Sequence, residues 1–203
     1  MRLLRSLREA LAKAKPDRAF SAGKSKLRPQ LSERATGAEI LLPGRVGMEA
    51  LLALSSPAQF GRGAQTVRDP LVRKLHETEE AAVVWPALPA VLTDASRQLL
   101  LSPGLQLEAR LHKVLSYAAG DHFDQFHSDS KREDSHICTL AVDCGAGACK
   151  GGEIDFDGGE SWTAEQAGDW CCWYATQQHR VRPVASGHRV VAIFNVLAHD
   201  DGA

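Results

Sequence analysis

The spacing of apolar residues changes near the middle of the chain. In two segments before Gly104, residues 48–54 and 88–101, apolar residues recur every three or four positions, which predicts amphipathic helices. After Gly104, apolar and polar residues alternate in short runs separated by turns, which predicts strands. We therefore expect one domain, residues 1–203, with a helical and loop-rich part at 1–104 and a β core at 105–197.

Two further helices are predicted in the N-terminal part. Residues 1–15 carry leucines at helical spacing, and Pro16, which lacks a backbone donor, would end that helix. Asp69 followed by Pro70 predicts a helix start, because Asp can cap free amide groups and Pro fits the first turn. We expect the N-terminal helices to pack outside the major sheet of the core.

The first predicted strand, residues 105–117, is the longest. Alternate positions along it are apolar, which places them on a single face of a sheet. The apolar set is Leu105, Leu107, Ala109, Leu111, Leu115 and Tyr117, interrupted by Lys113.

Further strands are predicted at 137–143, 170–174 and 189–197. In the last of these, Val191 and Ile193 lie on one face, while Val190 and Phe194 lie on the other. Both faces are apolar, which favours a sheet lined by a pocket inside and covered by helices outside.

Composition excludes several classes of protein. Hydrophobic residues make up 44% and charged residues 24%, as in ordinary globular chains. The net charge of -1 provides no basic field for a polyanion, so nucleic acid is not an expected partner. No apolar stretch approaches the roughly 20 residues that a transmembrane helix needs, so no membrane partner is expected.

The five cysteines form no CxxC pair, and reduced thiols favour a cytoplasmic location. Cys171 and Cys172 are adjacent on a predicted strand and would point to opposite faces, so a disulfide between them is not expected. The first 34 residues contain ten Lys or Arg against three acids. This basic segment fits either a surface helix or an organelle transit peptide.

The candidate chemistry begins with His127-Ser128-Asp129. In extended backbone, residues two apart share a face, so this imidazole and carboxylate could bind one ion. The neighbouring His122-Phe123-Asp124 has the same spacing and is the alternative pair. With His179 as a third ligand, two histidines and one carboxylate form the facial set of non-haem Fe(II) oxygenases, which leaves coordination positions open.

Arg189 follows His179 by ten residues, with Ser186-Gly187 between them as a turn signal. This spacing predicts a hairpin, with His179 near the end of one strand and Arg189 on the returning strand. The planar guanidinium would then be free to pair with a carboxylate in the pocket.

At these residues the chain resembles the 2-oxoglutarate and Fe(II)-dependent oxygenase superfamily, and within it the prolyl 4-hydroxylase-like branch. The similar blocks are Tyr117-Ala-Ala-Gly120-Asp-His-Phe123 before His127-Ser-Asp129, then Gly151-Gly152-Glu153-Ile154, then His179-Arg-Val181-Arg-Pro183-Val184-Ala-Ser-Gly187-His-Arg189. Together they extend over about 111–196. The last block is the most specific, because its histidine, proline, glycine and basic residue all have the spacing found in the branch.

The resemblance implies a double-stranded β-helix, or jelly-roll, that binds Fe(II) through His127, Asp129 and His179. It implies 2-oxoglutarate as cosubstrate, bound by Arg189 and with Tyr117 as a further candidate contact, and O₂ as oxidant. The implied activity is hydroxylation of a carbon, with a prolyl residue of a peptide or protein as the first candidate. We expect substrate recognition from the loops at 64–89 and 145–161.

Two alternative functions remain open, one suggested by a departure from the motif spacing of the branch and one by a different set of metal ligands. The branch has its first histidine three residues after the phenylalanine, whereas His127 is four after Phe123, and this insertion would suit a catalytically silent β-helix binding module. A cupin-like metalloenzyme would instead use extra histidine ligands and would not need Arg189. A nucleic-acid demethylase is disfavoured because no basic patch lies near the predicted site.

Overall fold

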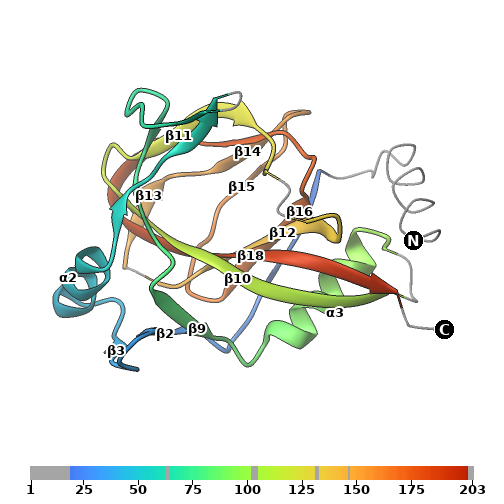
Figure 1. Ribbon diagram of the computed structural model, residues 1–203, viewed down its shortest axis with the longest axis horizontal. Helices are drawn as coiled ribbons and strands as arrows, with labels where there is room; N and C mark the ends of the chain where they lie inside the picture. The colour runs from blue at the N-terminus through green and yellow to red at the C-terminus, as the bar shows by residue number, and fades with distance from the viewer. Residues whose placement is uncertain (1–18, 63–64, 102–104, 131–132, 146, 201–203) are drawn as a thin grey trace.

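The computed structural model describes residues 19–62, 65–101, 105–130, 133–145 and 147–200. Most of these residues lie in antiparallel strands (Figure 1). The helices are α2 (Arg45–Ala53) and α3 (Leu88–Gln98). These two confirm the helices predicted at 48–54 and 88–101, with shifted ends.

The larger sheet contains the long strands of the predicted core. Its order is β1 (Phe20–Lys24), β16 (Asp169–Tyr174), β12 (His136–Asp143), β18 (Val184–Asp200), β10 (Leu105–Ala118), β8 (His76–Thr78) and β4 (Ser56–Pro57), and β13 (Cys149–Gly151) pairs with β18. We call this the major sheet. All four strands predicted after Gly104 are present in it, with extended bounds.

The minor sheet is smaller and contributes both histidines of the predicted site. Its order is β15 (Ser161–Trp162), β14 (Ile154–Phe156), β17 (His179–Val181), β11 (His122–His127) and β7 (Arg73–Lys74). A three-stranded sheet of β2 (Gln30–Glu33), β3 (Glu39–Ile40) and β9 (Ala81–Val84) and a hairpin of β5 (Phe60–Arg62) and β6 (Gln65–Val67) complete the described strands.

Two hydrophobic clusters lie on opposite sides of the major sheet. The inner cluster joins the two sheets, and includes Ala141 and Val191 from the major sheet with Phe156 and Val181 from the minor sheet. This packing makes the core an antiparallel sandwich of the jelly-roll kind.

The outer cluster lies on the other side of the major sheet. It joins Leu140 and Phe194 of that sheet to Val91 and Ala95 of α3 (Figure 1). The helix predicted at 1–15 lies outside the described residues. Within the part of the chain that is described, no helix has the length and hydropathy to cross a membrane.

The alternation along β16 and β18 separates these clusters as predicted. Val191 and Ile193 belong to the inner cluster, whereas Val190 and Phe194 belong to the outer one. The five cysteines are all free thiols, and the adjacent Cys171 and Cys172 lie in opposite clusters as predicted.

The prediction that 105–117 presents one apolar face is wrong, because β10 contains a β-bulge. The pairing with β18 joins Leu111 to Phe194 and then Lys113 to Ile193, so His112 is an extra residue. Leu111 therefore packs in the outer cluster, while Leu115 and Tyr117 pack in the inner cluster. The bulge also explains why Lys113 interrupts the apolar set.

Two predicted local structures are also wrong. No helix follows Asp69: its side chain and carbonyl accept amide hydrogen bonds from residues 71–73, but the chain makes one turn and then enters β7. The residues from His179 to Arg189 form no hairpin, because β17 and β18 belong to different sheets. Ser186 and Gly187 lie inside β18, opposite β13, rather than in a turn.

Candidate metal centre

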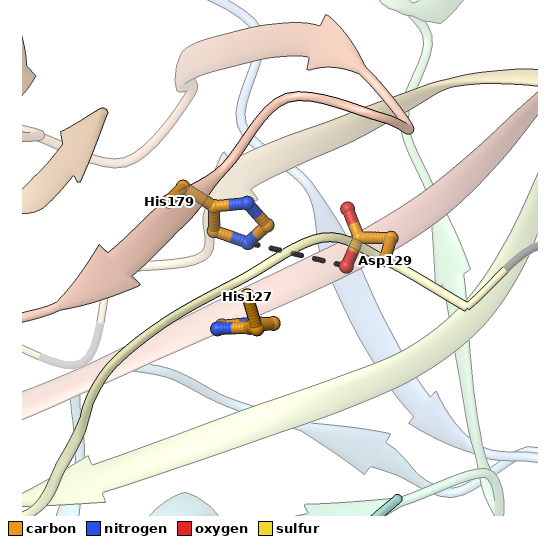
Figure 2. A group of neighbouring side chains, drawn as sticks. All are labelled: His127, Asp129 and His179. Carbon is orange, nitrogen blue, oxygen red and sulfur yellow. Dashed lines mark ion pairs between the residues drawn. The ribbon is translucent and has the colours of Figure 1, made fainter. Parts of the chain in front are cut away.

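His127, Asp129 and His179 come together between the two sheets (Figure 2). Their candidate ligand atoms all lie within 4.8 Å of one another, and Nε2 of His179 is 3.9 Å from Oδ1 of Asp129. His127 ends β11 and pairs directly with His179, which begins β17. Among the described residues, this is the group of at least three such side chains that could bind one metal ion.

The insertion before His127 is accommodated in the backbone. Phe123 pairs with Val181 and His127 with His179, so β11 advances four residues while β17 advances two. Such a bulge lets β11 carry extra residues and still direct His127 toward His179. The departure from the spacing of the branch therefore leaves the three ligands together.

Backbone carbonyls orient both imidazoles. Nδ1 of His127 lies 2.9 Å from the carbonyl of Gln125, and Nδ1 of His179 lies 3.1 Å from the carbonyl of Gln177. Because a carbonyl can only accept, each Nδ1 carries the hydrogen and donates it. This leaves the Nε2 lone pair of each ring available for a metal, the arrangement typical of ligating histidines.

Two donors hold the carboxylate of Asp129. The Thr139 hydroxyl donates to its Oδ2 at 2.7 Å, and the indole Nε1 of Trp173 donates to the same oxygen at 3.0 Å. Oδ1 is the oxygen that faces His179. The sequence pattern places Trp173 in the strand predicted at 170–174 and does not identify this hydrogen bond to Asp129.

Aromatic rings enclose the imidazoles. Phe123 stacks on His127 with 3.8 Å between ring centroids, and Trp173 lies 4.9 Å from His179. Burial is the main reason that the pKa of His127 falls to about 4, and the neighbouring His179 lowers it further. His127 is therefore neutral at physiological pH, which is the form that binds metal.

The alternative pair, His122 and Asp124, is engaged elsewhere. Both ring nitrogens of His122 lie near backbone carbonyls, those of Gly120 and Leu71, at 3.1 and 3.3 Å. Asp124 lies 3.2 Å from a guanidinium nitrogen of Arg180. The geometry therefore favours His127 and Asp129 as the metal-binding pair.

Arg189 and Tyr117 face the same space as the three ligands. They are register partners on β18 and β10, both are buried, and both line a cavity of about 460 Å³ with His127, Asp129 and His179. Burial raises the pKa of the Tyr117 hydroxyl, which stays protonated. Without the bulge in β10, the sequence alternation would not bring Tyr117 to this face.

The guanidinium of Arg189 is only partly satisfied by the protein. Nη1 donates to the carbonyl of Gly152, and Nε lies 4.0 Å from Oδ2 of Asp143. Nε and Nη2 are buried without a hydrogen-bond partner. The Gly151-Gly152 block thus orients Arg189, a contact whose purpose the motif alone did not reveal.

The residues present fit the cofactors that the sequence resemblance implies. Two imidazoles and a carboxylate are a suitable donor set for Fe(II), and they leave other coordination positions to small molecules. The orphaned buried donors of Arg189 fit a carboxylate, which would satisfy both the charge and the hydrogen bonds.

Solved structures with a similar fold include prolyl hydroxylases. One from Trichoplax adhaerens, in complex with a hypoxia inducible factor oxygen degradation domain peptide fragment, has a TM-score of 0.53 at 12% identity, covering 98% of this chain and 92% of that chain. A Pseudomonas putida prolyl-4-hydroxylase has a TM-score of 0.49 at 15% identity, covering 96% and 98%. A 2OG-Fe(II) oxygenase family oxidoreductase from Burkholderia pseudomallei has a TM-score of 0.48 at 16% identity, covering 76% and 79%.

No protein-family model and no curated protein sequence matches this chain. The chain shares the fold of the T. adhaerens prolyl hydroxylase. This confirms the resemblance, at the level of the fold, that the sequence blocks predicted.

Proposed function

We propose that this protein is a 2-oxoglutarate- and Fe(II)-dependent dioxygenase that hydroxylates a carbon of a peptide or protein, with a prolyl residue as the first candidate. The observation that carries the proposal is the single cavity that contains His127, Asp129 and His179 together with the unsatisfied guanidinium of Arg189. The candidate ligands and buried donors suited to a carboxylate thus line one cavity, an arrangement that would suit a 2-oxo acid cosubstrate. The shared fold adds support.

Each residue has a defined task in this proposal. His127, Asp129 and His179 would hold Fe(II), and Arg189 would bind the distal carboxylate of 2-oxoglutarate, with Tyr117 as a second contact to the cosubstrate. When bound, Fe(II) supplies the site at which O₂ oxidises 2-oxoglutarate to succinate and CO₂ and at which substrate is hydroxylated. The chain itself orients the cosubstrate and excludes water from the reacting centre through the apolar walls around Phe123 and Trp173.

The test is succinate formation from 2-oxoglutarate by the Fe(II)-loaded protein, screened over peptides and small molecules. We expect turnover in the wild type and none in His179→Ala, which removes one ligand. His76→Ala is the matched control, because His76 is exposed on β8 and is not one of the three ligands. Turnover that persists in His179→Ala would contradict the proposal.

The same preparation distinguishes the two alternative functions. A folded wild-type protein that fails to bind Fe(II) or Mn(II) together with 2-oxoglutarate would favour the silent binding module. Full activity in Arg189→Ala would favour a cupin-like enzyme, which has no need of that guanidinium.

A further inference from the structure

Arg73 is a second, mostly buried arginine that lines the cavity, and the proposed chemistry assigns it no role. It lies on β7, the edge strand of the minor sheet, and only 11% of its side chain is exposed. Its guanidinium carbon lies 5.0 Å from the ring of Phe123, which in turn stacks on His127. Arg73 therefore lines the cavity one aromatic ring away from the metal ligands.

The protein satisfies two of the three nitrogens of Arg73. Nη1 donates to the carbonyl of Gln59, and Nη2 donates to Oε2 of Glu77 at 2.9 Å. Nε is buried without a hydrogen-bond partner. A buried donor left in this state costs free energy unless a ligand provides an acceptor.

Lys113 shares the same carboxylate. Its Nζ donates to Oε2 of Glu77 at 2.9 Å, and 13% of its side chain is exposed. The β-bulge at His112 turns Lys113 toward the cavity, so this cation is placed there by the backbone rather than by the alternation of the strand.

The charges of this cluster do not balance. Arg73 and Lys113 share Glu77, and the other acids that line the cavity are Asp129, which belongs to the metal site, and Glu79, which is exposed. One positive charge therefore remains in a mostly buried place, where charges are normally paired. A carboxylate has the matching single negative charge, and it accepts hydrogen bonds from Arg and Lys together.

We propose that Arg73 and Lys113 bind a carboxylate of the substrate, so that the enzyme selects a substrate with an acidic group near the carbon to be hydroxylated. The inference rests on the proposed hydroxylase function. The carboxylate can come from an acidic side chain flanking the target residue of a peptide, or from the α-carboxylate of a free amino acid. Glu77 pairs with both cations and neutralises one of their two charges.

The experiment measures binding of matched probes to the full chain loaded with Mn(II) and 2-oxoglutarate. The peptide probes have a central proline and carry Asp, Asn or Lys at each flanking position. Free proline and prolinamide test the second source of the carboxylate. Binding of Mn(II) and 2-oxoglutarate is titrated separately for every variant, so that a failure of the oxygenase proposal is seen on its own.

We expect at least one Asp peptide, or free proline, to bind on the order of tenfold more tightly than its amide counterpart. Arg73→Gln should abolish this preference and leave the Kd for 2-oxoglutarate unchanged, whereas Glu77→Gln should strengthen it. Arg97→Gln is the matched control, because Arg97 is an exposed arginine on α3 outside the cavity and should change nothing.

Three results would overturn the inference. They are equal binding of acidic and amide probes by the wild type, no binding of any probe, and an Arg73→Gln variant that weakens 2-oxoglutarate instead of the probes. If Arg73→Gln does not fold, Glu77→Gln decides, because an unchanged acidic preference in that variant is also a contradiction. Loss of Mn(II) and 2-oxoglutarate binding with the acidic preference intact would refute the oxygenase proposal alone.

Discussion

The indole Nε1 of Trp173 donates a hydrogen bond of 3.0 Å to Oδ2 of Asp129, the oxygen that also accepts the Thr139 hydroxyl. Trp173 and Thr139 are register partners on β16 and β12 of the major sheet. The major sheet therefore orients the side chain of Asp129, which follows β11 of the minor sheet. The candidate metal site therefore depends on both sheets, although its two histidines come from the minor sheet alone.

Trp173→Phe should weaken metal binding. The variant keeps an aromatic ring but removes one of the two donors that orient Asp129, and loss of such an outer partner typically lowers metal affinity by about 10–100-fold. Titration with Mn(II) measures the effect. Trp170→Phe is the control, because Trp170 is equally buried but packs in the outer cluster against Gly23. Equal losses in the two variants would mean that packing, not the hydrogen bond, is responsible.

Arg189→Gln should raise the Kd for 2-oxoglutarate by a factor on the order of 30 or more, because it removes a charge-assisted, buried carboxylate contact. Metal affinity should change little, since Arg189 is not a ligand. The measurement is a 2-oxoglutarate titration of the metal-loaded protein. Arg182→Gln is the control, because Arg182 is half-exposed and paired with Asp155. A parallel loss of metal affinity in Arg189→Gln would indicate general damage to the site.

Deletion of His112 tests whether the bulge in β10 determines which face of the sheet the following residues occupy. His112 is the extra residue of the bulge, so its removal joins Leu111 to Lys113 in regular pairing and leaves Tyr117 on the inner face. Deletion of Val114 instead moves Lys113 into the buried position that Val114 occupies in the outer cluster. We expect the first variant to fold, at a cost of about 2 kcal/mol or less, and to bind 2-oxoglutarate.

The second deletion should unfold the protein or abolish binding. Thermal unfolding and the 2-oxoglutarate titration compare the two. If the variants behave alike, the assignment of the bulge to His112 is wrong.

Gly187→Ala should destabilise the fold strongly. Gly187 has φ of +81° and lies against β13, where an added Cβ would overlap the carbonyl of Ala148. Gly37→Ala is the matched control, because Gly37 has a similar φ of +73° but open space around the added Cβ. The control should lose about 1–2 kcal/mol from backbone strain, and Gly187→Ala should lose several kcal/mol.

Chemical denaturation gives both free energies of unfolding. Equal losses of unfolding free energy in the two variants would show that the close approach of β13 to β18 does not exclude a side chain at position 187. Such a result would also weaken the link between the glycine and the placement of Arg189 two residues later.

Much of the metal site could be predicted from residue type and spacing. Ligand chemistry requires histidines and a carboxylate, and the HxD pair keeps both side chains on one side of an extended backbone. The choice between His122 and His127 was harder, because both pairs satisfy that rule. The pairing of His127 with His179 across β11 and β17 favours His127 and Asp129.

The alternation of apolar and polar residues predicted side-chain faces and turns incorrectly where the backbone is irregular. Alternation assigned Leu105 to Tyr117 to one face, and the bulge at His112 divides them between two clusters. The turn signal at Ser186-Gly187 predicted a hairpin, although Gly187 permits a close approach of strands inside β18. Glycine marks positive φ in both cases, so sequence cannot separate them.

The sequence by itself determined the main strands of the core and the candidate ligand set, because these depend on side-chain chemistry and on periodicity along a short segment. Only the tertiary structure decided which residues share the cavity. Arg73, Lys113 and Glu77 are separated in the chain from His127 and Arg189, and their meeting depends on sheet register and on a bulge. Register is a property of strand pairs, so a single strand does not encode it.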